Sequence, residues 1–206
     1  MKKETLYFDS ADGKHKTAGY IYTENIVEPK AVIQLSHGMC EYIERYEWVA
    51  DFFTARGYIF AGNDHLGHGN SSKPSEYGDF DEEHLEIDLK KMNDILREKY
   101  PLLPIILYGH SMGSFFARWY ASRYPDTIDG LIISGTAGPS IRNIGGRALA
   151  GFIARTHKEG YVSKLMAKLS FGRNNRKITG AETANDWLSH DSEIVEKYMN
   201  DPKCNF

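Results

Sequence analysis

Hydrophobic positions before residue 139 form short unbroken runs, separated by stretches of helical periodicity. The unbroken runs are typical of strands buried on both faces of a sheet, and they cover residues 31–35, 58–61, 104–108 and 131–134. Between them, apolar residues recur at spacings of three and four, which predicts amphipathic helices over residues 43–53, 84–99 and 112–124. Near the N-terminus, two alternating segments flank turn-forming residues and predict a β-hairpin over residues 4–9 and 16–23.

Strands that alternate with helices predict a mostly parallel, doubly wound sheet with helices on both faces, which is an α/β fold. Ligands of such sheets bind at the carboxyl ends of the strands. Polar clusters stand at three of these ends, in residues 36–38, 63–65 and 109–111. The sequence therefore predicts that three strand ends meet at one functional site.

The chain changes character after residue 139. Residues 1–139 hold 21 acidic and 14 basic side chains, whereas residues 140–206 hold 7 acidic and 11 basic ones and contain no strand-like run. Residues 148–169 show a helical periodicity that Gly160 interrupts. We therefore expect residues 1–139 to form the N-terminal part of an α/β core and residues 140–206 to form a helical cap.

Residues 109–113 read Gly-His-Ser-Met-Gly and lie between a predicted strand and a predicted helix. A nucleophile elbow requires that context, because a tight strand-to-helix turn lifts a serine hydroxyl above the sheet. Ser111 is thus the candidate nucleophile for acyl transfer. The alternative is a chance match at a Gly-rich turn, and the flanking strand and helix argue against it.

Acyl transfer also needs two backbone N–H groups aimed at the developing oxyanion. One comes from the residue after the nucleophile, Met112, and the other from the loop after the first buried strand, where we assign Met39. Gly38 permits a close turn in that loop, and we assign Gly38 and His110 to substrate binding. We interpret His37 as a structural histidine whose ring ties loops together.

Composition and charge exclude several other classes of protein. With 41% hydrophobic residues the chain can build a core, and a net charge of −3 gives no reason to expect nucleic acid as a partner. Two distant cysteines favour a reduced, cytoplasmic protein, and no apolar stretch reaches membrane-spanning length. Asp64, His65 and His68 have no further ligand nearby in the sequence, so we expect no metal site and no organic cofactor.

Together these motifs resemble the α/β-hydrolase superfamily, and within it the bacterial monoacylglycerol lipase and lysophospholipase-like serine hydrolases. The resemblance implies that Ser111 is the nucleophile of an ester hydrolase, with Met39 and Met112 as oxyanion donors and residues 140–206 as the lid. Tyr42 stands where many relatives carry histidine, which affects only a loop contact. The matching pieces are His37, Gly38, Glu41, Arg45, Tyr46, residues 64–71, residues 109–114, residues 186–189, Tyr198, Asp201 and Pro202.

In these relatives the catalytic acid and histidine follow the cap, in the chain order Ser, Asp, His. The only histidines after Ser111 are His157 and His190, both in the cap, and neither is a credible general base. We therefore expect the triad Asp and His to be absent from this chain and a C-terminal core segment to be missing. On that expectation the chain alone is inactive, and it pairs with the missing segment or with another chain.

For the complete protein, the sequence predicts hydrolysis of a monoacylglycerol, a lysophospholipid or a similar single-chain lipid ester. The alternatives are another chemistry on the same elbow, such as a peptidase or thioesterase, and a truncated protein that binds an acyl ligand without turnover. Residues 142–177 carry nine basic side chains and one acidic one among apolar residues. They form either a solvated helix face or a helix that contacts an anionic membrane surface.

Overall fold

The computed structural model describes residues 1–206 except for residues 25–27, 139–140, 158–160, 162, 173 and 205. The chain falls into two compact units, Met1–Thr136 together with Phe206, and Ala137–Asn205. The domain boundary predicted between residues 139 and 140 lies outside the described residues. The first unit carries the sheet, and the described residues of the second unit form only helices and loops.

Six strands form one mixed sheet in the first unit, in the order β1-β2-β4-β3-β5-β6. β1 pairs antiparallel with β2, and β2 pairs antiparallel with β4, while β4, β3, β5 and β6 run parallel. The mostly parallel α/β sheet expected from the sequence is thus confirmed. The strands are β1 (Lys2–Asp9), β2 (Lys16–Thr23), β3 (Val32–Ser36), β4 (Ile59–Asn63), β5 (Ile105–His110) and β6 (Gly130–Ser134).

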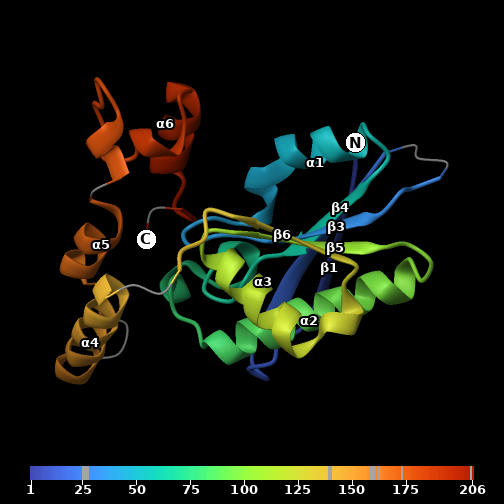
Figure 1. Ribbon diagram of the computed structural model, residues 1–206, viewed down its shortest axis with the longest axis horizontal. Coiled ribbons are helices and arrows are strands. Elements are labelled where there is room, and N and C mark those ends of the chain that lie inside the picture. Colours follow the sequence, from blue (N-terminus) through green and yellow to red (C-terminus); the bar gives the residue numbers. More distant parts are fainter. Residues whose placement is uncertain (25–27, 139–140, 158–160, 162, 173, 205) are drawn as a thin grey trace. The chain divides into compact units, whose positions relative to one another are not determined.

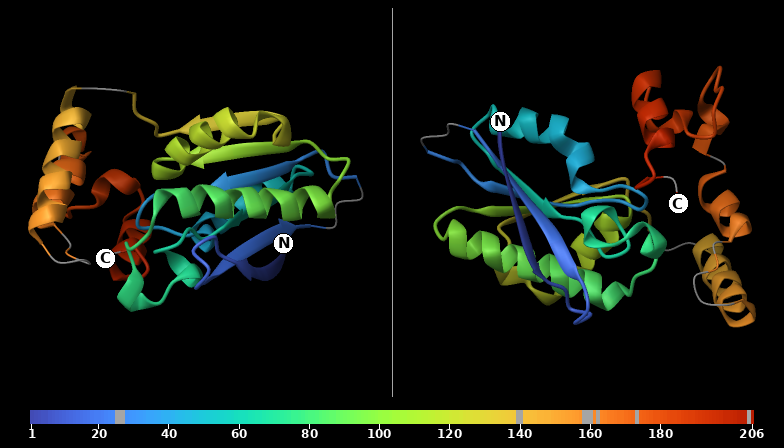
Figure 2. Two further views of the ribbon diagram at one scale, coloured as in Figure 1. Left: turned by 90° about the horizontal axis from the view of Figure 1, so that it is seen from below. Right: turned by 180° about the vertical axis from the view of Figure 1, so that it is seen from behind.

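Helices cover both faces of this sheet (Figure 1). α1 (Glu47–Thr54) lies on one face, and α2 (Glu82–Lys99) and α3 (Met112–Arg123) lie together on the other, as the right-hand view in Figure 2 also shows. Side chains of β3 alternate between the two layers, with Ile33 packed in the cluster that includes α1 and Val32 in the cluster that includes α2. Because both faces of the strand are buried, its apolar run is unbroken.

The helix predicted over residues 43–53 begins with a 3-10 turn and becomes α-helical only at α1. Asp64 accepts a hydrogen bond from the Ile43 N–H at 2.8 Å at the start of that turn. Glu41 accepts one from the Tyr46 hydroxyl at 2.6 Å at its end. Hydrogen bonds therefore hold both ends of this 3-10 turn in place before α1 begins. The short 3-10 helices of the first unit are η1 (Ile43–Tyr46), η2 (Gly69–Ser71), η3 (Pro74–Glu76) and η4 (Pro125–Thr127).

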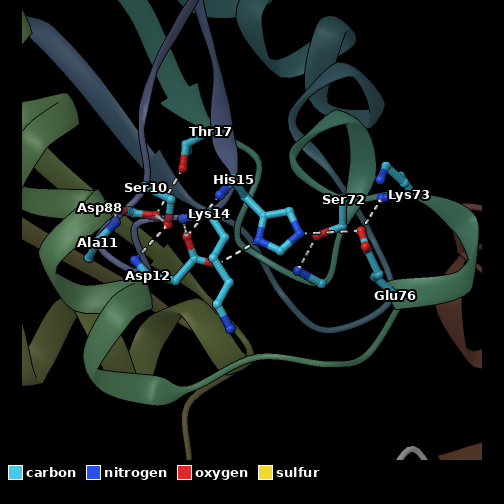
Figure 3. Close-up of polar contacts among 11 residues, drawn as sticks. Ser10, Ala11, Asp12, Lys14, His15, Thr17, Ser72, Lys73, Glu76 and Asp88 are labelled. Carbon is cyan, nitrogen blue, oxygen red and sulfur yellow. Dashed lines mark hydrogen bonds and ion pairs between the residues drawn. The ribbon is translucent and has the colours of Figure 1, made fainter.

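The turn of the β1–β2 hairpin is anchored to α2 by one buried carboxylate, Asp88 (Figure 3). Asp88 accepts hydrogen bonds from the Ser10 hydroxyl at 2.7 Å and the Thr17 hydroxyl at 2.8 Å. It also accepts one from the Ala11 N–H at 2.7 Å. A carboxylate with several hydrogen-bond donors is well suited to burial, so this contact fixes the hairpin on the helix layer.

A histidine in the same turn bridges two carboxylates, as Figure 3 shows. His15 Nδ1 lies 2.5 Å from Asp12 Oδ2, and its Nε2 lies 3.4 Å from Glu76 Oε2. The hydrogen bond to Asp12, together with both negative charges, raises the pKa of His15 above its ordinary value. The hairpin turn is thereby joined to η3, in the loop that follows β4.

The described residues of the second unit form three α-helices. Phe171, at the end of α5, stacks on Trp187 of the 3-10 helix η6, with ring centroids 6.2 Å apart. The helix predicted over residues 148–169 is two helices, the first of which begins at Ile141, while Gly160 lies outside the described residues. No described helix of the chain is both long and apolar enough to span a membrane. The helices of this unit are α4 (Ile141–Thr156), α5 (Lys164–Phe171), η5 (Asn174–Lys177), η6 (Asp186–Leu188) and α6 (Ser192–Asn200).

Candidate active site

The carboxyl ends of β3, β4 and β5 meet at one place in the first unit. Ser36 Oγ lies 3.0 Å from His65 Nε2, and the His65 N–H donates to His37 Nε2 at 2.9 Å. Gly38 lies so close to the nucleophile elbow that an added Cβ would be 3.1 Å from Ser111 Cβ. The three polar clusters of the sequence therefore surround one site, as expected.

Ser111 stands on a strained turn between β5 and α3. Its φ of +49° is unfavourable for a residue with a side chain, and such strain is a feature of nucleophile elbows. A Cβ on Gly109 would lie 2.6 Å from the Ala117 side chain, and one on Gly113 would lie 2.0 Å from the Ser36 carbonyl oxygen. Only glycine fits at these two positions, so their identity sets the turn that presents Ser111.

The loop after β3 is held by the ring of His37, which is fully buried. Nδ1 lies 2.7 Å from the Gly38 carbonyl oxygen, and Nε2 accepts the His65 N–H. This pattern requires the neutral tautomer with the proton on Nδ1. In a trans peptide the Gly38 carbonyl and the Met39 N–H point in opposite directions, so the hydrogen bond to His37 fixes the direction of that N–H.

The carboxylate of Glu41 also stabilises the loop after β3. Its Oε1 accepts the Gly38 N–H at 2.5 Å and the Tyr46 hydroxyl at 2.6 Å. In the sequence, Glu41 and Tyr46 stand out only through the family resemblance, which assigns them no role. The hydrogen bond between Glu41 and the Gly38 N–H spans only three residues of the chain. The position of Gly38 in the sequence does not by itself predict this bond.

Three buried histidines pack together under this loop. The ring centroid of His37 lies 4.3 Å from that of His65 and 5.4 Å from that of His68. Burial, with the mutual repulsion of the rings, lowers the pKa of His65 to about 3 and that of His37 well below its ordinary value. Burial also lowers the pKa of His68 to about 4. All three rings are neutral near pH 7.

Asp64, at the end of β4, braces three segments. Its carboxylate accepts the N–H of Ile43 and that of Asn70, each at 2.8 Å, and the Tyr20 hydroxyl at 3.2 Å. Burial raises the pKa of Asp64 to about 6. These contacts occupy both carboxylate oxygens. No group of three or more potential metal ligands occurs among the described residues of the chain.

A cavity of about 540 Å³ opens beside the elbow, between α3 and the segment that leads into α2. Both proposed oxyanion donors line it, and most of its wall is apolar. The sequence does not reveal this cavity, because its wall combines residues from three separate segments. Its apolar and aromatic walls are formed by Met39, Phe80, Met112, Phe115, Phe116 and Trp119.

The remaining histidines singled out in the sequence lie in different surroundings. His110 precedes Ser111, with Nδ1 3.4 Å from Ser134 Oγ and its ring edge-on to Tyr46. His157 stacks on Tyr161 in the second unit, with ring centroids 4.0 Å apart. Among the described residues, no histidine forms a hydrogen bond with the Ser111 hydroxyl.

Residues 27–206 match the family described as serine aminopeptidase, S33. The chain belongs to that family. A monoacylglycerol lipase of Mycolicibacterium smegmatis is 31% identical to this S33-family chain over 175 residues, which are 85% of the chain and 56% of the lipase. Human monoglyceride lipase is 35% identical over 107 residues, which cover 51% of the chain and 34% of the human protein.

Solved structures show the same fold for this S33-family chain. A thermostable carboxyl esterase from Bacillus coagulans matches all of the chain with a TM-score of 0.86 and 32% identity, over 67% of its own length. A soluble variant of monoglyceride lipase from Saccharomyces cerevisiae matches with a TM-score of 0.73 at 21% identity, over 64% of its length. The resemblance to monoacylglycerol lipase-like α/β-hydrolases is thus confirmed, and the chain spans 56% of the mycobacterial relative.

Proposed function

We propose that the protein is a serine hydrolase of carboxylic esters and that its substrates are single-chain lipid esters, such as monoacylglycerols or lysophospholipids. The observation that carries the proposal is the strained elbow at Ser111, in a family whose relatives include lipases and esterases. The apolar cavity beside that elbow favours a lipid ester over a peptide.

In the proposed reaction, the Ser111 hydroxyl oxygen attacks the ester carbonyl carbon while a general base takes its proton. The carbonyl π bond breaks, and the oxygen becomes an oxyanion. Collapse of this intermediate expels the alcohol, which takes up the proton, and leaves an acyl-enzyme. Water then attacks the acyl-enzyme, releasing the fatty acid and restoring Ser111. We propose that the histidine that serves as base and its acid partner are not among these 206 residues.

The oxyanion meets two backbone donors, Met112 and Met39. Met112 is the first residue of α3, so its N–H has no acceptor within the helix and lies at the positive end of the helix dipole. Met39 supplies the second N–H, in the direction that the His37 hydrogen bond fixes. Loss of one such donor costs about 10²–10³ in kcat in other acyl-transfer enzymes. Gly38 and His110 are proposed to contact the substrate on either side of Ser111.

Two other functions are distinguished by substrate. A peptidase or thioesterase on the same elbow should prefer an anilide or a thioester to the matched oxygen ester. A protein that binds acyl ligands without turnover should bind a lipid ester and leave it intact. Among the described residues that line the cavity, all but Glu82, Glu83 and the indole N–H of Trp119 are apolar, which suits a chain of methylenes better than a peptide backbone.

The test compares two serines of the elbow and its helix. In the complete protein, Ser111→Ala should lower kcat for a monoacylglycerol by about 10⁶, the cost of removing a catalytic serine. Ser122→Ala removes an exposed hydroxyl from the same helix, α3, and should leave kcat unchanged. Both proteins are compared by thermal unfolding. A Ser111→Ala protein that retains a tenth of the parent activity would assign the chemistry to another residue.

A further inference from the structure

The loop after β3 contains a residue in an unfavourable backbone conformation. Cys40, which directly follows Met39, has a φ of +56°. Among the described residues, only Cys40 and Ser111 have a positive φ without being glycine. A residue with a Cβ keeps this left-handed conformation only where the surrounding contacts hold it there. Contacts with Cys40 therefore help to fix the shape of the loop that carries Met39.

One of these contacts comes from Phe206, which groups with the first unit. The Phe206 carbonyl oxygen lies 4.0 Å from Cys40 Sγ. The Phe206 ring is tilted against the ring of Tyr77, with centroids 5.2 Å apart. A Cβ on Gly78 would lie 3.3 Å from the Phe206 ring, so the ring packs directly on the backbone there. Phe206 is thus packed between the loop after β3 and the loop after β4.

The Phe206 ring also contacts the buried histidine cluster. Its centroid lies 5.4 Å from that of His68, in an edge-to-face arrangement, and the His68 ring lies 5.4 Å from the His37 ring. His37 holds the Gly38 carbonyl oxygen through Nδ1, the contact that fixes the direction of the Met39 N–H. Phe206 therefore reaches the same loop by a second route, through two histidine rings.

We propose that Phe206 is a positioning residue for ester hydrolysis, because it holds Cys40 in its left-handed conformation and so keeps the Met39 N–H aimed at the oxyanion. The inference rests on the proposed function, since it takes Met39 as an oxyanion donor. If Cys40 relaxed to a negative φ, the peptide group between Met39 and Cys40 would rotate and shift the backbone that carries the donor. Loss of a whole donor, about 10²–10³ in kcat, is the upper limit of the effect.

The first test compares glycine with alanine at position 40 in a protein that lacks the Phe206 ring. In the complete protein, Phe206→Ala should lower kcat for a 4-nitrophenyl ester by about tenfold or more, with little change in KM. Because glycine adopts a positive φ without strain, adding Cys40→Gly should restore kcat to within about threefold of the parent value. Adding Cys40→Ala instead removes the thiol and keeps the Cβ, so it should restore nothing.

The matched control for the loss of a ring is Phe8→Ala. Phe8 is a half-buried phenylalanine on β1 that packs in the cluster that includes α2. Its removal weakens packing elsewhere in the first unit and should leave kcat unchanged. Thermal unfolding of all the variants shows that each is folded at the assay temperature.

The second test follows the loop without any catalysis, through the thiol of Cys40. Burial, together with the charge of Glu41, raises the pKa of this thiol to about 11. Loss of the Phe206 ring should expose the thiol and lower its pKa, and each unit of that fall raises the thiolate fraction about tenfold. Alkylation of Cys40 by iodoacetamide at about pH 8, located by peptide mapping, should therefore accelerate about tenfold or more in Phe206→Ala and stay at the parent rate in Phe8→Ala.

The inference is wrong if Cys40 is alkylated at the parent rate in Phe206→Ala. It is also wrong if Cys40→Gly does not restore kcat, if Cys40→Ala restores it equally well, or if Phe206→Ala changes KM alone. If the complete protein hydrolyses no ester while Cys40 alkylation accelerates as stated, the proposed function fails and the part of Phe206 in holding the loop stands.

Discussion

Lowering the pH from 7.5 to 5.5 should destabilise the first unit by about 2–3 kcal/mol, because of the buried histidine cluster. His37, His65 and His68 are neutral in the fold, where burial lowers the pKa of each. In the unfolded chain each titrates near pH 6.5. Since the unfolded state binds more protons below that pH, stability falls as the pH drops, and it continues to fall toward the folded pKa values of about 3 and 4 for His65 and His68.

The magnitude follows from proton occupancy. At pH 5.5, one unit below its pKa, an unfolded histidine is about 90% protonated, which stabilises the unfolded state by about 1.4 kcal/mol per ring. Three rings give about 4 kcal/mol. Asp64 acts in the opposite direction, because burial raises its folded pKa to about 6, and so does His15, because Asp12 raises its folded pKa. Protonation of Asp64 in the fold returns about 1 kcal/mol at pH 5.5 and the His15 contact up to about 1 kcal/mol, so the three buried histidines dominate.

Urea unfolding followed by circular dichroism at pH 7.5, 6.5 and 5.5 measures this dependence. His68→Phe keeps an aromatic ring against Phe80 and removes one titrating group, so it should flatten the dependence by about 1.4 kcal/mol. Phe80→Leu is the matched control, since it weakens the same packing and removes no titrating group. It should lower stability equally at every pH.

Two results would refute the reasoning. One is a free energy of unfolding that stays constant from pH 7.5 to 5.5 in the parent protein. The other is a His68→Phe protein with the same pH dependence as Phe80→Leu. Either would mean that the rings take up protons in the folded state, and hence that they are not held neutral by burial.

Three further predictions concern the loop, the hairpin and the second unit. His37→Ala should lower kcat for ester hydrolysis by about 10² or more with little change in KM, because the Met39 N–H loses its fixed direction. A raised KM with an unchanged kcat would contradict this. His15→Gln should reduce the free energy of unfolding by up to about 1 kcal/mol below pH 6.5. This difference should vanish as the pH rises through the raised folded pKa of His15. A difference that persists at pH 9 in urea unfolding would contradict the prediction. Arg155, Lys164 and Lys168 are exposed on α4 and α5. Replacing all three by Glu should weaken binding to anionic vesicles, measured by co-sedimentation, by about 1 kcal/mol of binding free energy per basic residue. Unchanged binding at low salt would leave only a solvated helix face.

The sequence predicts those parts of the fold and the site that depend on the pattern of residues within a short segment. The strand at β3 is buried on both faces and therefore apolar throughout, and the glycines at 109 and 113 are required by the turn itself. Such features leave a signature within a few residues.

The features that the sequence does not predict depend on contacts between segments that are far apart in the chain. The hydrogen bond from His65 to His37 joins residues 28 positions apart, and the cavity wall combines α3 with the start of α2. The sequence also does not predict the start of α4 at Ile141, because Gly145 and Gly146 weaken the helical pattern there.

The most direct test of the central claim is covalent labelling of the natural protein with an alkyl fluorophosphonate, followed by intact mass measurement and peptide mapping. The account predicts a single adduct per molecule, located on Ser111, and its loss in Ser111→Ala but not in Ser122→Ala. An adduct on another residue of an ester-hydrolysing protein, or unchanged labelling of Ser111→Ala, would contradict the assignment of Ser111 as the nucleophile.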